Sequence, residues 1–99
     1  MRNDTTYLVT FNCGGRDVPR IAIEAVLYSA RDWLRWADGT YLIRSNLHSS
    51  VWLEKIRPVL AEGDDVFIAA LDPNNRVGWM KPLALDWITR DAIAIPSGS

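Results

Sequence analysis

Residues 13–16 place a thiol, two glycines and a guanidinium side by side, as Cys13, Gly14, Gly15 and Arg16. Two glycines ahead of a helix can turn backbone N–H groups toward an anion, and Arg16 would add positive charge there. A thiol near the positive end of a helix can also have a lowered pKa and act as a nucleophile. Neither motif is specific, because glycine pairs are common in turns and a single cysteine is commonly a small buried side chain. The segment is therefore a candidate anion-binding loop or reactive thiol, with a plain turn as the alternative.

His48 is the only histidine, so it is the only imidazole base available to a cysteine nucleophile. We expect it at the surface, where a helix begins. One histidine and one cysteine are too few ligands for a zinc site. Asp64 and Asp65 are adjacent, and neighbours in a strand point to opposite faces, so we interpret them as a charged turn. The chain has no phosphate-binding glycine motif and no nucleophile elbow, and we expect neither a metal nor a cofactor.

The charged residues nearly cancel, because eleven Lys and Arg against twelve Asp and Glu give a net charge of −1. This balance excludes a protein that coats nucleic acid or an anionic membrane through bulk positive charge. Residues 1–60 carry eight basic and six acidic groups (+2), whereas residues 61–99 carry three and six (−3). Five residues of the first half are candidates for binding an anion or a nucleic acid: Arg16, Arg20, Arg31, Arg35 and Arg44. The alternative is a solvated surface whose arginines are balanced by neighbouring carboxylates.

Five tryptophans in 99 residues are difficult to bury in one small core, and a single cysteine excludes an intramolecular disulfide that would stabilise it. We therefore expect one or two of the tryptophans to lie at a protein interface, where Trp is enriched. The candidate interface residues are Trp33, Trp36, Phe67, Trp79 and Trp87. The alternative is that they fill the core or cover a face of the sheet.

The first half of the chain predicts a strand, a helix and a hairpin. A strand over 5–12 places Tyr7, Val9 and Phe11 on one face. Asp17 is a suitable N-cap for a helix over about 17–30. Asp38-Gly39 between the strand-like runs 33–37 and 40–44 predicts a two-residue hairpin in which both central residues have positive φ.

The second half predicts two helices and one strand. A serine at 49 or 50 caps a helix whose apolar side uses Leu53 or Trp52, with its last turn bent by Pro58. Residues 65–71 form a nearly continuous apolar strand, which is consistent with burial on both faces or with an interface. A short helix begins at Lys81-Pro82. Residues 92–95 alternate weakly, as in a strand, before a flexible end.

The predicted order is strand, helix, strand, strand, helix, strand and a C-terminal appendage. This is the α+β, ferredoxin-like βαββαβ arrangement, an antiparallel sheet with two helices on one face. We expect one domain over residues 1–91, with the appendage included, and a tail over 92–99. The other face of the sheet needs cover from polar residues, a nucleic acid, the C-terminus or a second chain.

Over about residues 5–90 the chain resembles the CRISPR-associated protein two-like family, whose relatives include virulence-associated protein D. The resemblance rests on the Thr-Tyr-Leu-Val start at 6–9, Asn12, the hairpin 33–43, the strand 66–71, and the later Trp79 and Trp87. It implies a homodimer, often with the last strand of one chain extending the sheet of the other. Some members bind double-stranded DNA, and some are described as metal-dependent ribonucleases.

The resemblance also implies an acidic nuclease residue at the end of the first strand, where this chain has Asn12. A neutral amide carries no charge to hold or activate a divalent cation. We therefore expect no metal-dependent cleavage and no catalytic residue, with Asn12 as a degenerate position.

Together these features predict a dimeric Cas-like module that binds nucleic acid or protein in the cytoplasm, in antiviral defence or counter-defence. One alternative is a metal-dependent endoribonuclease or deoxyribonuclease, and another is an antitoxin-like or phage-encoded inhibitor acting through a protein interface. No apolar run reaches the length that spans a membrane, so we expect no membrane partner.

Overall fold

The computed structural model describes residues 4–94. In chain order the elements are β1 (Thr5–Asn12), α1 (Arg20–Leu27), β2 (Asp32–Ala37), β3 (Thr40–Ser45), α2 (Ser49–Ile56), the 3₁₀ helix η1 (Arg57–Val59), β4 (Asp65–Ala70) and α3 (Pro82–Ala94). The strands form one antiparallel sheet in the order β2-β3-β1-β4. The predicted α+β, ferredoxin-like arrangement is confirmed.

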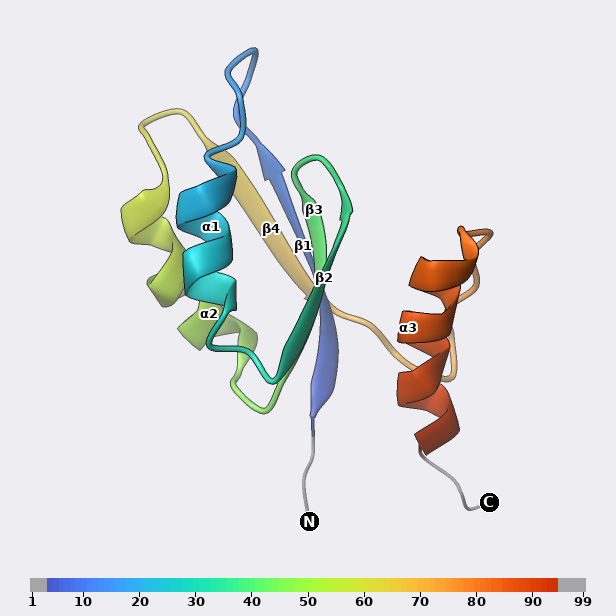
Figure 1. Cartoon of the computed structure of the whole chain (residues 1–99). Coiled ribbons are helices and arrows are strands. Elements are labelled where there is room, and N and C mark those ends of the chain that lie inside the picture. Colours follow the sequence, from blue (N-terminus) through green and yellow to red (C-terminus); the bar gives the residue numbers. More distant parts are fainter. Residues whose placement is uncertain (1–3, 95–99) are drawn as a thin grey trace.

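The sheet has two different faces because side chains alternate along each strand. Tyr7, Val9 and Phe11 of β1 point into the core, as predicted. Their buried partners on α1 and α2 are Ile23, Leu27, Trp52 and Ile56. Figure 1 shows α1 and α2 against this face, with α3 on the other side of the sheet.

We call the other side the second face. It carries Thr6, Leu8 and Thr10 of β1, because they alternate with the core residues. Their cross-strand neighbours on β3 lie on the same face and are Arg44, Leu42 and Thr40. Helix α3 lies on this side of the sheet (Figure 1), so the C-terminal part of the chain covers the second face in part. Cover by the C-terminus was one of the four possibilities considered from the sequence.

Helix α1 is shorter than predicted and begins at Arg20. The N-cap is Pro19, with no side-chain cap, so the prediction that Asp17 caps the helix is wrong. The physical reason is Pro19 itself, because a residue that precedes proline is disfavoured in the helical conformation. Val18 therefore lies outside the helix, and the first helical residue is Arg20, directly after Pro19.

The hairpin between β2 and β3 has the predicted Asp38-Gly39 loop, since Ala37 pairs with Thr40. Gly39 has φ +81°, and a Cβ there would lie 3.4 Å from the carbonyl oxygen of Phe11. Asp38 does not have positive φ, so that part of the prediction is wrong. The register shifts between Arg35 and Ala37, which makes a bulge in β2 and changes how the strands enter the turn.

Helix α2 begins at Ser49 with His48 as its N-cap, so the prediction that Ser49 or Ser50 caps this helix is wrong. The His48 ring Nδ1 accepts a hydrogen bond from the backbone N–H of Ser50 at 3.1 Å, and His48 is exposed, as predicted. Trp52, not Leu53, points into the core. The α-helix ends at Ile56 and continues as η1, which contains Pro58, in keeping with the predicted effect of this proline.

Helix α3 is longer than predicted and extends to Ala94. Residues 92–94 are helical, so the weak strand predicted there is wrong. Alanine at 92 and 94 favours a helix that is already propagating, and this outweighs a short alternation of apolar residues. Residue 95 and the expected flexible end lie outside the described residues.

Candidate functional site

The loop that contains Cys13 is attached to the turn before β4. Arg16 donates to Asp64 at 2.5 Å, and Asp64 also accepts from the backbone N–H of Ala61 at 2.8 Å. Asn12 Oδ1 accepts from the N–H of Gly14 at 3.0 Å, which fixes the turn itself. The Arg16 guanidinium is therefore paired with a carboxylate of the same chain. The loop serves as a structural connection between the end of β1 and the turn before β4.

Cys13 is buried, and burial raises the pKa of its thiol, with a further contribution from the negative charge of Asp64. The hypothesis of a lowered pKa at this thiol is therefore wrong. The helix that follows begins at Arg20, seven residues along the chain from Cys13, and not at Asp17 as the hypothesis assumed. Cys13 behaves as the small buried side chain that was the alternative from the sequence.

Asp64 should make stability depend on pH in the acid range. The hydrogen bond from Arg16 holds the pKa of Asp64 below its ordinary value of 3.8. A carboxylate with a lowered pKa in the folded state stabilises fully above the unfolded value, and this contribution disappears as the pH falls through the folded value. We expect Asp64→Asn to lower stability at neutral pH and to flatten the acid limb of the stability curve between about pH 5 and pH 2.

The measurement is urea unfolding of wild type and variant across that range. Asp65→Asn is the matched control, because it removes the same charge one residue away, and no contact with Arg16 is seen for it within residues 4–94. Identical pH profiles for Asp64→Asn and Asp65→Asn would contradict this account of the Arg16–Asp64 pair.

The five candidate anion-binding arginines each lie beside a carboxylate of the same chain. Arg20 and Arg35 meet at Glu24, at 3.9 Å and 3.2 Å. The other three lie in separate ion pairs, namely Arg16–Asp64, Arg31–Asp4 at 2.7 Å and Arg44–Asp32 at 3.5 Å. The fold brings only Arg20 and Arg35 together, and it gives each arginine a local acidic partner.

Glu24 was among the carboxylates expected to balance the arginines, but its contact with Tyr41 was not predicted. Besides the two arginines it accepts a hydrogen bond from the Tyr41 hydroxyl at 2.9 Å. Burial and this hydrogen bond raise the pKa of Tyr41 well above its ordinary value. The i,i+4 spacing of Arg20 and Glu24 was the one available signal, whereas the approach of Arg35 and Tyr41 depends on how α1 packs on the sheet.

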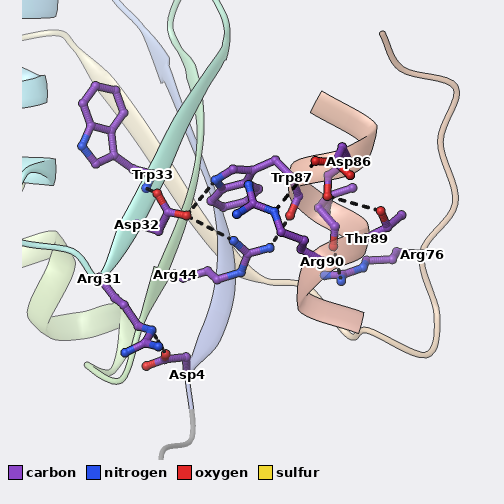
Figure 2. A network of polar contacts seen from close by, with 11 residues as sticks. Asp4, Arg31, Asp32, Trp33, Arg44, Arg76, Asp86, Trp87, Thr89 and Arg90 are labelled. Carbon is purple, nitrogen blue, oxygen red and sulfur yellow. Dashed lines mark hydrogen bonds and ion pairs between the residues drawn. The ribbon is translucent and has the colours of Figure 1, made fainter. Parts of the chain in front are cut away.

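Arg44 and Trp87 attach α3 to the second face of the sheet (Figure 2). The Arg44 guanidinium stacks 3.8 Å from the centroid of the Trp87 ring and also donates to the Trp87 carbonyl oxygen. The Trp87 indole N–H donates to Asp32 at 3.0 Å, and Asp32 also faces Arg44. Arg44 is therefore a buried structural residue that holds the helix and not an exposed phosphate ligand.

The five candidate interface residues divide into two groups. Trp87 of α3 is buried against the sheet, and Trp33 is half-buried with its ring centroid 6.1 Å from that of Tyr41. The other three are exposed in the single chain: Trp36 (48%), Phe67 (64%) and Trp79 (100%). These three are available to a partner.

Strand β4 lies at one edge of the sheet and pairs only with β1 within the described residues. The backbone N–H of Leu71 donates to the carbonyl oxygen of Thr6 at 2.8 Å. Because hydrogen-bonded pairs alternate along an antiparallel ladder, residues 65, 67, 69 and 71 direct their backbone groups toward β1. The N–H and C=O groups of Val66, Ile68 and Ala70 therefore point outward from the sheet.

The two edges of the sheet differ in their protection. Edge strands are usually protected from pairing with other chains by charges, prolines or bulges. β2 has a bulge and carries Asp32 and Arg35. From Val66 to Ala70, β4 has no charge, no proline and a regular register with β1. Its outer edge is therefore the part of this sheet best suited to accept another strand.

Within residues 4–94, no group of three or more His, Cys, Asp or Glu side chains is placed to hold a metal ion. Asn12 instead lies opposite Asp65 in the ladder and is used in the turn to Gly14. The same part of the chain contains no helix long and apolar enough to cross a bilayer.

Comparison with known proteins adds no relative: no family model, no curated protein and no solved structure matches this chain. On the geometry alone, the candidate site is the outer edge of β4 together with the exposed Phe67, which form a surface for contact with protein.

Proposed function

We propose that this chain is a non-catalytic protein-binding module that works as a homodimer, with β4 of one copy pairing with β4 of the other. The single observation that supports the proposal most is the unprotected edge of β4, with three outward-pointing backbone residues and no charge between Val66 and Ala70. A homodimer of ferredoxin-like domains is also what the resemblance to the CRISPR-associated protein two-like family implies. The proposal of a cytoplasmic role in defence or counter-defence rests on that resemblance.

A two-fold axis at Ile68 gives a complete antiparallel register. Val66 then lies opposite Ala70 of the second copy, and Ile68 lies opposite its own equivalent. Each of these three hydrogen-bonded pairs exchanges two bonds, so all six outward groups are used. On the second face, Phe67 lies opposite Ala69 of the second copy, and a large side chain beside a small one is a favourable cross-strand neighbour.

The arginines favour a protein partner over a nucleic acid. Each of the five candidate residues has a carboxylate within 4 Å, so a phosphate would have to compete with an acidic group of the chain itself. Arg44 is also buried beneath α3. With a net charge of −1, long-range attraction for DNA is absent as well.

Two measurements on the purified chain test this proposal. Light scattering should give about twice the 11.2 kDa mass of one chain, with dissociation on dilution. Titration of a fluorescent DNA duplex should give no binding near neutral pH, even at low salt where phosphate contacts are strongest. A monomer at all concentrations would contradict the dimer, and salt-sensitive duplex binding would favour the nucleic-acid function instead.

A further inference from the structure

A groove of about 180 Å³ lies beside β4, between this strand and α2. Its walls are Ser49, Ser50 and Leu53 of α2 and residues 66–68 of β4. Sites for drug-sized molecules commonly have volumes of about 300–1,000 Å³. This groove is smaller, so its size suits a single side chain from a protein partner.

The lining of the groove is uncharged. Among the described residues, no Asp, Glu, Lys or Arg lines it, and Leu53 is 39% exposed in the single chain. A larger hollow next to it also contains Leu53, but its lining includes three charged residues, namely Arg57, Asp64 and Asp65. An apolar side chain is therefore buried more favourably in the groove beside Ile68 than in the neighbouring hollow.

The two-fold register of the β4 pairing brings one side chain of a second copy to this groove. Val66 and Ile68 point to the helix-covered face of the sheet, because they lie opposite the core residues Phe11 and Val9 in the ladder. With the axis at Ile68, the Ile68 of the second copy lies directly opposite and on the same face, as cross-strand neighbours do. It therefore lies just outside β4, on the side where α2 and β4 form the groove.

We propose that Ile68 of the second copy fills this groove, so that α2 forms a second layer of the dimer interface over the paired β4 strands. This inference rests on the β4 pairing of the proposed function and adds the burial of side chains to its backbone hydrogen bonds. Because the axis is two-fold, the contact occurs twice, with each Ile68 against Leu53 of the other copy. Ser49 and Ser50 have small side chains, so this wall of the groove leaves room for the isoleucine.

The first test adds a carboxylate to the wall of the groove. Ser50→Glu should raise the dissociation constant of the dimer by roughly ten-fold or more, because the charge is buried against the incoming Ile68. A carboxylate in the first turn of a helix is favourable, so the single chain should keep its fold, which circular dichroism checks. Light scattering over a dilution series measures the dissociation constant.

Two control variants separate the groove from other effects of this substitution. Val51→Glu adds the same charge in the same turn, at an exposed position that does not line the groove, and should change the dissociation constant by less than about three-fold. Ser50→Ala removes the 2.9 Å hydrogen bond between the Ser50 hydroxyl and His48 Nδ1 without adding a charge, and should leave the dimer unchanged.

The second test detects the contact itself in a dimer of one isotope-labelled and one unlabelled copy. We expect a nuclear Overhauser effect between the methyl groups of Ile68 in one copy and those of Leu53 in the other. If the outer amides of β4 are protected but this effect is missing, or if Ser50→Glu and Val51→Glu act equally, the groove contact is overturned and the β4 pairing stands. A wild-type chain that stays monomeric, or a dimer with unprotected outer amides of β4, overturns both.

Discussion

Trp52→Ala should strongly destabilise this chain, with an expected loss of about 3–5 kcal/mol in the free energy of unfolding. Trp52 is completely buried between α2 and the sheet, where it contacts the core formed by β1, β3 and α1. Replacing it with alanine leaves a cavity that the surrounding elements cannot close. Domains of this size have unfolding free energies of about 5–15 kcal/mol, so this one substitution removes a large part of the total.

The measurement is urea unfolding at one fixed protein concentration, because self-association makes apparent stability depend on concentration. Trp79→Ala is the matched control: it removes the same side chain from a fully exposed position and should change stability by less than about 0.5 kcal/mol. Trp52→Phe should cost much less than alanine, since the buried indole N–H has no hydrogen-bond acceptor within the described residues. Equal losses in Trp52→Ala and Trp79→Ala would contradict this placement of the core.

Ala70→Pro should disrupt the dimer while leaving the chain folded. The N–H of Ala70 points away from β1, so proline removes no hydrogen bond of the chain's own sheet. The side chain of Ala70 is exposed, which leaves room for the ring. In the two-fold register the Ala70–Val66 pair occurs twice, so one substitution removes two intermolecular hydrogen bonds. At about 1 kcal/mol each, their loss raises the dissociation constant by at least roughly ten-fold.

Ala70→Val is the control for this prediction, because it keeps the N–H and raises the preference for a strand. Light scattering over a dilution series should show an unchanged dimer for Ala70→Val and a weakened one for Ala70→Pro. Circular dichroism of both variants should match the wild type. A Pro variant that is folded and dimerises as strongly as the wild type would contradict pairing through this edge.

The sequence was informative where local chemistry decides the structure. The alternation of Tyr7, Val9 and Phe11 identified the core face of β1, and Asp38-Gly39 located the hairpin. It was less informative where two local signals compete. Asp17 is a good cap by residue type, but Pro19 prevents the residue between them from joining the helix.

The candidate site was harder to predict, because its contacts join residues far apart in the chain. The Trp87 indole meets Asp32 across 55 positions, and no pattern in either segment indicates the other. The balance of arginines and carboxylates was visible in the composition, but which carboxylate meets Arg35 or Arg44 depends on the packing of α1 and α3. The edge position of β4 likewise follows from the strand order and not from its own residues.

The most direct test of pairing through β4 is amide hydrogen exchange at Val66, Ile68 and Ala70, measured above and below the dissociation concentration. In the monomer these three N–H groups point to solvent, whereas those of Phe67 and Ala69 bond to β1. We predict that exchange at 66, 68 and 70 becomes slow when the dimer forms, while exchange at 67 and 69 is slow at both concentrations. A dimer in which the amides of 66, 68 and 70 still exchange as rapidly as in the monomer would contradict the account.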